Sequence, residues 1–244
     1  TSWYNETLGT SVRGTRKEFP AVAVFVAESN PNRITIYDGD DPDLPMWMVF
    51  TASTNTNANF LAVSGQTLSS IFILNGDLCI GFPSGNGWGV GRVNFLSDSQ
   101  GWYWTSANIF KQVRNSVAER NDQNGYYDSK NGVSGLANAS VNNIAMTVLP
   151  NAPIDDATGL PIPTIAAATN GGVSVIKDDG SVVDITQNSP YTQSHNVFFS
   201  DYGKILYDNE DTQVVYEVDI PSSDIGYGVY NSISNGRVIY PVRN

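Results

Sequence analysis

The sequence is short of the residues on which several classes of site depend. It has one cysteine, Cys79, and one histidine, His195, so it can form no internal disulfide and no cluster of zinc ligands. The two could in principle pair as nucleophile and base. Cys79, however, lies between Leu78 and Ile80 without neighbouring cations, which favours a buried, inert thiol. The sequence therefore argues against thiol enzymes, zinc fingers and metallohydrolases, and we expect no cofactor.

Positive charge is also scarce. Thirteen Lys and Arg stand against 24 Asp and Glu, a formal charge of −11, which repels phosphate backbones and argues against nucleic acid as a partner. The single basic cluster, Arg13, Arg16 and Lys17, could dock onto an acidic neighbouring subunit or form a solvated lead-in to the first strand. No apolar run reaches the ~18 residues that a membrane-spanning helix needs, so we expect no membrane insertion.

Helical patterning is confined to one stretch, Ser106 to Asn121, where a short helix is possible. Elsewhere, short apolar or alternating runs are separated by turns rich in Asn, Asp and Gly, as the 22 glycines and 12 prolines suggest. The strongest hairpin signal is Asn75-Gly76, between the runs 70–74 and 77–82. We expect an all-β protein with helix in under about 15% of its residues.

A strand, an Asn/Asp-Gly turn and a second strand recur along the chain in units of about 35 to 50 residues, which is typical of β-propeller blades. Residues 1–244 would then form a single propeller of about five blades, closed by pairing of the strand 237–242 with a strand near the N-terminus. The alternative is a β-sandwich of one or two domains. The chain begins at Thr1 without an initiator Met or a signal-peptide pattern, which suggests a processed piece or fragment of a longer chain.

Three segments carry a family resemblance. Residues 12–20 read VRGTRKEFP, residues 34–50 contain ITIYDGDDP and LPMWMVF, and residues 148–186 contain VLPNAPIDDATGLPIPT and VSVIKDDGSVVDIT. Together they resemble uncharacterised proteins encoded by bacteriophages of marine bacteria, commonly regarded as structural or host-recognition components of the virion. Longer members often add a laminin-G-like jelly roll after propeller-like repeats. The resemblance implies a virion protein, made in the host cytoplasm during assembly, with other virion subunits as partners.

Aromatic residues near flexible loops are the candidate ligand-binding residues. Trp88 and Asn86 lie in a glycine-rich loop, and Trp102 and Trp104 share one face of a strand. Sugars stack their C–H faces on aromatic rings while amide groups bind their hydroxyls. Trp88 should be more exposed than Trp47, which has apolar neighbours on both sides and should belong to the core.

Acidic residues offer two further kinds of site. Asp38 and Asp40 alternate in an acidic turn that weakly resembles a calcium loop, although Pro42 interrupts it and a closing Glu is missing. A glycosidase would need two carboxylates at roughly 5 to 10 Å. Its candidates are Glu28, Asp77, Asp184 and Asp201.

The sequence thus favours a non-enzymatic, virion-associated β-propeller that is structural, recognises a glycan on the host surface, or does both. Two alternatives remain open. One is a lectin-like carbohydrate-binding module, and the other is a propeller glycosidase with paired carboxylates.

Overall fold

The computed structural model describes residues 1–29, 32–52, 61, 67–83, 89–105, 110–113, 116–121, 127–130, 135–156, 158–187, 192–209, 214–227 and 236–239. In these ranges the protein is built from β-strands, with two single-turn 3-10 helices, η1 (Ser2–Asn5) and η2 (Val117–Glu119). The all-β prediction is confirmed. No helix in these ranges is long and apolar enough to cross a membrane.

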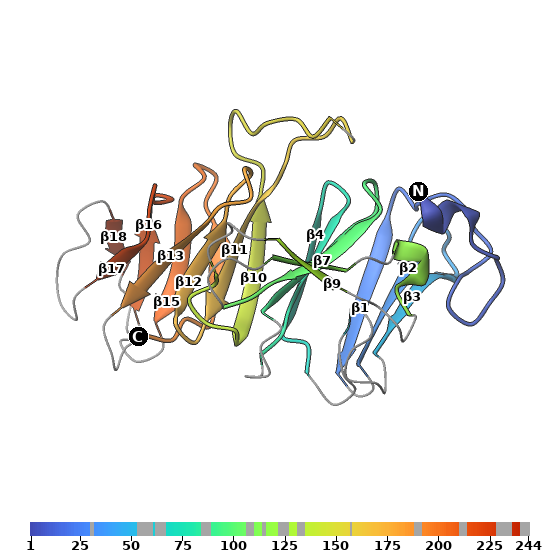
Figure 1. Ribbon diagram of the computed structural model, residues 1–244, viewed down its shortest axis with the longest axis horizontal. Coiled ribbons are helices and arrows are strands. Elements are labelled where there is room, and N and C mark those ends of the chain that lie inside the picture. Colours follow the sequence, from blue (N-terminus) through green and yellow to red (C-terminus); the bar gives the residue numbers. More distant parts are fainter. Residues whose placement is uncertain are drawn as a thin grey trace.

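The strands form four sheets that follow one another along the chain (Figure 1). Sheet I contains β1 (Ala23–Ser29), β2 (Asn32–Asp38) and β3 (Met46–Thr51). Sheet II contains β4 (Ser70–Leu74), β5 (Asp77–Gly81), β6 (Val90–Asn94), β7 (Ser99–Tyr103), β8 (Phe110–Val113) and β9 (Tyr127–Lys130). Sheet III contains β10 (Val141–Thr147), β11 (Thr164–Thr169), β12 (Gly172–Ile176), β13 (Val182–Gln187) and β17 (Ile225–Tyr227). Sheet IV contains β14 (Val197–Phe199), β15 (Ile205–Asn209), β16 (Val214–Val218) and β18 (Gly236–Ile239).

Most neighbouring strands pair as antiparallel meanders, because short turns join strands that are consecutive in the chain. The β4–β5 hairpin turns at Asn75 and Gly76, whose φ angles of 51° and 77° are both left-handed. Asn and Gly adopt that region most readily, so the sequence signal and the observed turn agree. Two pairs depart from the meander, because β17 joins sheet III as the parallel neighbour of β13 and leaves β18 to pair with β16 in sheet IV.

The four sheets pack face to face in the order I, II, III and IV, so the two middle sheets bury both faces. In β5, Leu78 and Ile80 pack toward sheet I, whereas Cys79 packs toward sheet III. In β11, Ala167 belongs to the core between sheets II and III, and Ala166 to the core between sheets III and IV. Alternate side chains of one strand therefore serve two different cores.

Two residues behave as the sequence predicts. Trp47 is fully buried, and its ring lies in edge-to-face contact with Trp3 and Phe19. Cys79 is also fully buried, and this burial raises the pKa of its thiol far above the ordinary value. Its lack of reactivity toward thiol reagents stays a prediction.

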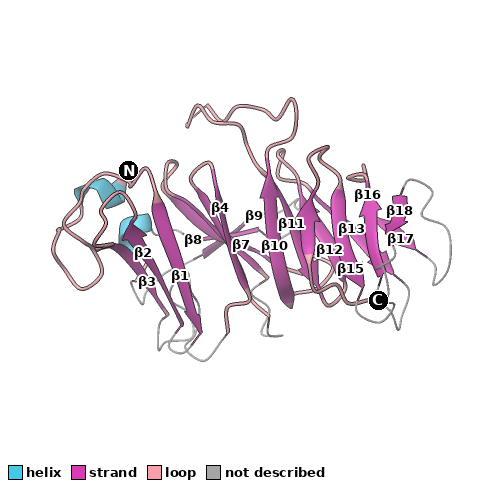
Figure 2. Ribbon diagram, turned by 180° about the vertical axis from the view of Figure 1, so that it is seen from behind, coloured by secondary structure: helices cyan, strands magenta, loops and turns pink. Residues whose placement is uncertain are grey.

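The predicted ring closure is wrong. The C-terminal strand β18 pairs with β16 of its own sheet, and β1, the first strand, lies at the opposite end of the molecule in both ribbon views (Figures 1 and 2). The described strands thus form an open series of four sheets, not a closed ring of five blades. A single two-layer sandwich is not observed either, since the described strands form four stacked sheets.

The predicted helix over 106–121 is also wrong where the chain is described. Phe110–Val113 forms β8, which pairs with β7, and only Val117–Glu119 makes a 3-10 turn. Pairing with the exposed edge of β7 satisfies the backbone of residues 110–113, and a single amphipathic turn has no comparable partner.

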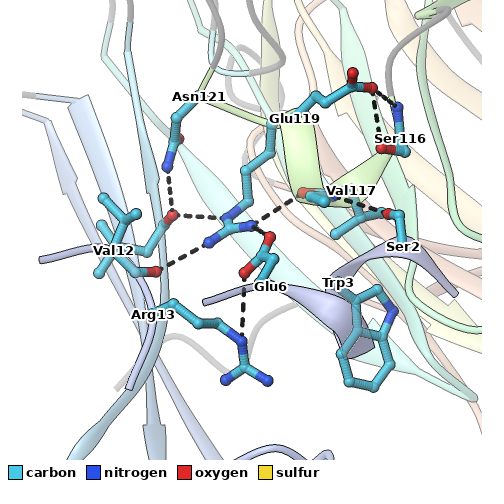
Figure 3. A network of polar contacts seen from close by, with 12 residues as sticks. Ser2, Trp3, Glu6, Val12, Arg13, Ser116, Val117, Glu119 and Asn121 are labelled. Carbon is cyan, nitrogen blue, oxygen red and sulfur yellow. Dashed lines mark hydrogen bonds and ion pairs between the residues drawn. The ribbon is translucent and has the colours of Figure 1, made fainter. Parts of the chain in front are cut away.

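The N-terminal segment joins sheet I to sheet II through two buried arginines (Figure 3). Arg13 and Arg120 each have side chains only 1% exposed, and both contact the carboxylate of Glu6. Arg13 donates to the carbonyl of Trp47 at 2.8 Å, and Arg120 donates to that of Val49 at 2.8 Å. Burial lowers the pKa of both guanidinium groups, and the Glu6 carboxylate opposes that shift.

The residues of the basic cluster all contact groups of the same chain. Arg13 is enclosed, Arg16 is held by Asp38 and Asp40 at 2.7 Å each, and the Lys17 ammonium lies over the Tyr4 ring. All three cations thus have partners within the chain.

Candidate functional site

The first strand of each sheet lies at an edge of that sheet, and β10 contacts both β4 and β14. Side chains of one sheet also cap backbone N–H groups of the next. Ser70 in β4 accepts from the Ile144 amide, and Asn143 in β10 accepts from the Val197 amide, each at 3.2 Å. Such contacts give hydrogen-bond partners to backbone N–H groups of edge strands. They also link β4, β10 and β14 into one continuous surface.

A groove lies in this surface, and we call it the first-strand groove. Its volume is about 350 Å³, and its walls come from β4, β10, β14 and the loop after β14. Phe72 from sheet II and Phe198 from sheet IV line it with 37% and 58% of their surface exposed. Met146 and Val148 line the side formed by sheet III. Three sheets thus bring two exposed aromatic rings to one hollow.

Polar groups enter the groove from the turn between β14 and β15. Ser200 and Asp201 line it, and Thr147 adds a hydroxyl from the end of β10. The turn is fixed by hydrogen bonds from the Gly203 amide to the Ser200 carbonyl (2.9 Å) and from the Lys204 amide to the Ser200 hydroxyl (3.1 Å).

Gly203 is required at this turn for two reasons. Its φ of 72° is left-handed, and a Cβ added there would lie 2.9 Å from Cδ2 of Leu149. A rigid turn therefore holds Asp201 beside the apolar walls, with backbone geometry that a larger residue would strain.

The charge of the groove is one-sided. Among its described lining residues the single ionisable side chain is Asp201. The nearest cation along the chain, Lys204, is paired with Asp219 at 2.9 Å. The groove therefore combines aromatic surface, two hydroxyls and one carboxylate, a set suited to a hydroxyl-rich ligand with apolar faces.

Two of the four ligand-binding residues predicted from sequence, Trp102 and Trp104, do not line the groove. Trp102 is 4% exposed in the core between sheets I and II, so its ring cannot be the sugar platform that we expected. Trp104 is half-buried after β7, where its carbonyl accepts from the Leu136 amide. Trp88 and Asn86 fall outside the described residues, and their role stays a prediction.

The acidic turn of sheet I is an internal ion-pair site. Arg16 contacts both Asp38 and Asp40, and the Asp40 carboxylate also accepts from the amides of Ala21 and Val22 at 2.9 Å. The Ala21 amide, then Arg16, hold the pKa of Asp40 below its ordinary value. Within the described ranges, no group of three or more His, Cys, Asp or Glu side chains gathers to hold a metal ion.

The four candidate glycosidase carboxylates lie on four different sheets. Glu28 pairs with Arg33 and Asp77 with Arg92, each at 2.7 Å. Asp184 accepts from the Ser174 hydroxyl at 2.7 Å, and desolvation raises its pKa. Asp201 alone reaches the groove. No second member of the set lines it, so the groove offers no counterpart for paired-carboxylate chemistry.

A second cavity of about 350 Å³ lies between sheet II, the β12–β13 turn and the loop before β11. Its described lining is mainly charged and polar, and one of its cations, Arg92, is held by a buried carboxylate outside the lining. Arg92 donates twice to Asp77, which also accepts from Asn94. Among its described lining residues, only Tyr103 and Ile162 provide large apolar surfaces. We therefore regard the first-strand groove as the better candidate.

The sequence analysis missed Phe72 and Phe198 because each stands in an ordinary strand. A local signal existed at Phe198-Phe199, since adjacent residues of a strand face opposite sides and one ring must leave the core. Phe199 packs against the core between sheets III and IV, and Phe198 is the exposed partner.

Comparisons with known proteins yield structural likeness alone. No protein-family model matches the chain, and no curated protein matches it in sequence. A protein of unknown function from Bacteroides caccae is similar with a TM-score of 0.40 and 10% identity, over 80% of this chain and 53% of that one. An auxiliary nutrient binding protein from Bacteroides thetaiotaomicron is similar with a TM-score of 0.34 and 6% identity, over 79% of this chain and 65% of that one. The chain thus spans less than two thirds of either protein.

Proposed function

We propose that this chain is a non-enzymatic carbohydrate-recognition protein that binds a glycan in the first-strand groove. The observation that carries the proposal is the convergence of two exposed rings, Phe72 and Phe198, with the carboxylate of Asp201 in one hollow.

The chemistry of the groove supports a sugar in particular. One face of a pyranose presents C–H groups, which lose little by leaving water for the face of a phenyl ring. Its hydroxyls need acceptors and donors at the rim, and Asp201, Ser200 and Thr147 supply both kinds. The groove offers polar and apolar surface in nearly equal parts, which suits a ligand that has both C–H faces and hydroxyls.

The arrangement of the sheets supports an open, propeller-like architecture. Face-packed sheets whose first strands lie side by side resemble successive propeller blades, and the first strands would line the central channel of such a ring. On this proposal the groove lies on the surface that the first strands of sheets II, III and IV form in this open series. The resemblance to marine bacteriophage proteins supports a place in a virion, with a host-surface glycan as the ligand and other virion subunits as neighbours.

The test is a glycan array read with the wild-type chain and with Phe198→Ala, Phe72→Ala and Tyr4→Ala. Tyr4 is the matched control, because its ring is 39% exposed but belongs to η1, at the sheet I end of the molecule (Figure 1). We expect the wild type to bind a defined set of glycans and Phe198→Ala to weaken binding by about tenfold or more. The melting midpoint of Phe198→Ala should change little, because the ring is exposed.

Two results would contradict the proposal. If no glycan binds, the lectin and host-recognition functions both fail and a purely structural role remains. If Tyr4→Ala weakens binding as much as Phe198→Ala does, the glycan lies outside the groove. Release of shortened sugars from bound glycans, lost on Asp201→Asn, would favour the glycosidase alternative instead.

A further inference from the structure

The groove lacks the groups that recognise an anion. Its described lining includes no Lys, Arg or His, and Asp201 is its one charged residue. Proteins that bind sulfated, sialylated or uronic-acid sugars need a cation or several N–H donors to replace the water around the anion. The walls of this groove are instead phenyl rings, aliphatic side chains and hydroxyls.

The cation next to the turn, Lys204, is not among the described residues that line the groove. Its ammonium lies 2.9 Å from the Asp219 carboxylate in an exposed ion pair. Beyond the groove, the formal charge of −11 repels anionic ligands over the distance set by the salt concentration.

We infer that the groove selects sugars without negative charge, either neutral or amine-bearing, and that Asp201 is the residue that sets this preference. The inference rests on the glycan-binding function proposed above and specifies its ligand class. A carboxylate accepts hydrogen bonds but donates none, so Asp201 favours sugar hydroxyls and ammonium groups. A second carboxylate or a sulfate placed beside it meets like charge, and because Asp201 is exposed this repulsion weakens as salt is added.

The experiment uses an array on which the same sugar backbones are printed in neutral, amine-bearing, and sulfated or uronic-acid forms. It is read at low and at physiological salt with the wild type, Asp201→Asn and Asp43→Asn. Asp43 is the matched control, since it is an exposed aspartate in the loop between β2 and β3 and its substitution changes the net charge equally. Solution titration of the strongest neutral glycan and its acidic counterpart then gives the two affinities.

We expect the wild type to bind neutral or amine-bearing forms and to bind acidic forms at least about tenfold more weakly. Asp201→Asn should reduce that difference severalfold and weaken any amine-bearing ligand, whereas Asp43→Asn should leave the difference near its wild-type value.

Three outcomes would overturn the inference. Acidic forms that bind as tightly as neutral ones, with binding lost in Phe198→Ala, would reject the charge preference while leaving the glycan-binding function intact. Equal effects of Asp43→Asn and Asp201→Asn would show that net charge sets the preference, not Asp201. If no form binds at all, the proposed function fails together with the inference.

Discussion

The junction between sheets I and II and the junction between sheets III and IV solve the same packing problem in different ways. The first is filled with large aromatic rings, among them Trp3, Trp47 and Phe95, and is crossed by the Arg13–Glu6–Arg120 cluster. The second is filled mainly with alanine and valine, among them Ala166 and Ala168 of β11, and also holds the stacked pair Tyr207 and Tyr216. Where small side chains face one another the sheets pack through close aliphatic contact. Where the N-terminal segment enters, rings and buried charges fill the space.

The difference has an energetic consequence. A buried cation is costly unless carbonyls and a carboxylate surround it, so the first junction depends on the N-terminal segment being in place. The junction between sheets III and IV contains no charged side chain among its described core residues, so its stability depends on how closely its apolar side chains pack. The two junctions should therefore fail in response to different substitutions.

The largest effect should come from Glu6→Gln. The substitution keeps the shape of the side chain but removes the carboxylate that both guanidinium groups, each 1% exposed, contact. We expect a loss of about 3–5 kcal/mol in the free energy of unfolding, measured by denaturant titration. Glu28→Gln is the control, because Glu28 and its partner Arg33 are both exposed and such pairs contribute little. Equal destabilisation by the two variants would show that the cluster does not hold the first junction.

A smaller effect should follow from Ala168→Leu in the junction between sheets III and IV. Ala168 is fully buried, and three extra carbons have no space between sheets III and IV. Overpacking of this kind costs about 1–3 kcal/mol. Ala27→Leu is the matched control in an exposed position of β1. If Ala168→Leu is as stable as the wild type, the sheets are not packed as tightly as the alanine pattern implies.

The smallest effect concerns Asp184, at the edge of the core between sheets II and III. Burial raises the pKa of its carboxyl, so the folded state binds this proton more tightly than the unfolded state does. Asp184 therefore favours folding most below its unfolded pKa, and this contribution is lost as the pH rises through the folded pKa. The Asn side chain of Asp184→Asn can still accept a hydrogen bond from the Ser174 hydroxyl but does not ionise. The substitution should therefore remove the decrease in stability that Asp184 causes as the pH rises.

Melting curves recorded from pH 3 to pH 7 check this expectation. The variant should gain stability relative to the wild type as the pH rises through the acid range and keep that gain at pH 7. A difference that does not vary with pH would contradict it.

Local structure could be predicted well from the sequence, because strands and turns carry local signals. The predicted runs 70–74 and 77–82 match β4 (Ser70–Leu74) and β5 (Asp77–Gly81), and Asn75-Gly76 forms the predicted hairpin turn. The strand β17 was not predicted, since three residues paired in parallel carry almost no pattern.

Long-range features could not be predicted in the same way. Arg13 resembles a solvated surface residue in the sequence, and its burial depends on carbonyls and on Glu6, which only the folded chain brings around it. The groove also depends on residues that are distant in the sequence. Phe72 and Phe198 are 126 positions apart, and their approach depends on the packing of sheets II, III and IV. The pairing of β18 with β16 was likewise decided by packing, not by the alternation within 237–242.

The most direct test of the glycan-binding proposal is a crystal structure of the chain with the strongest-binding neutral oligosaccharide from the array. We expect a sugar ring stacked on Phe198 or Phe72, with one of its hydroxyls within hydrogen-bond distance of the Asp201 carboxylate. A glycan bound elsewhere on the molecule, with the first-strand groove occupied by water alone, would contradict the proposal.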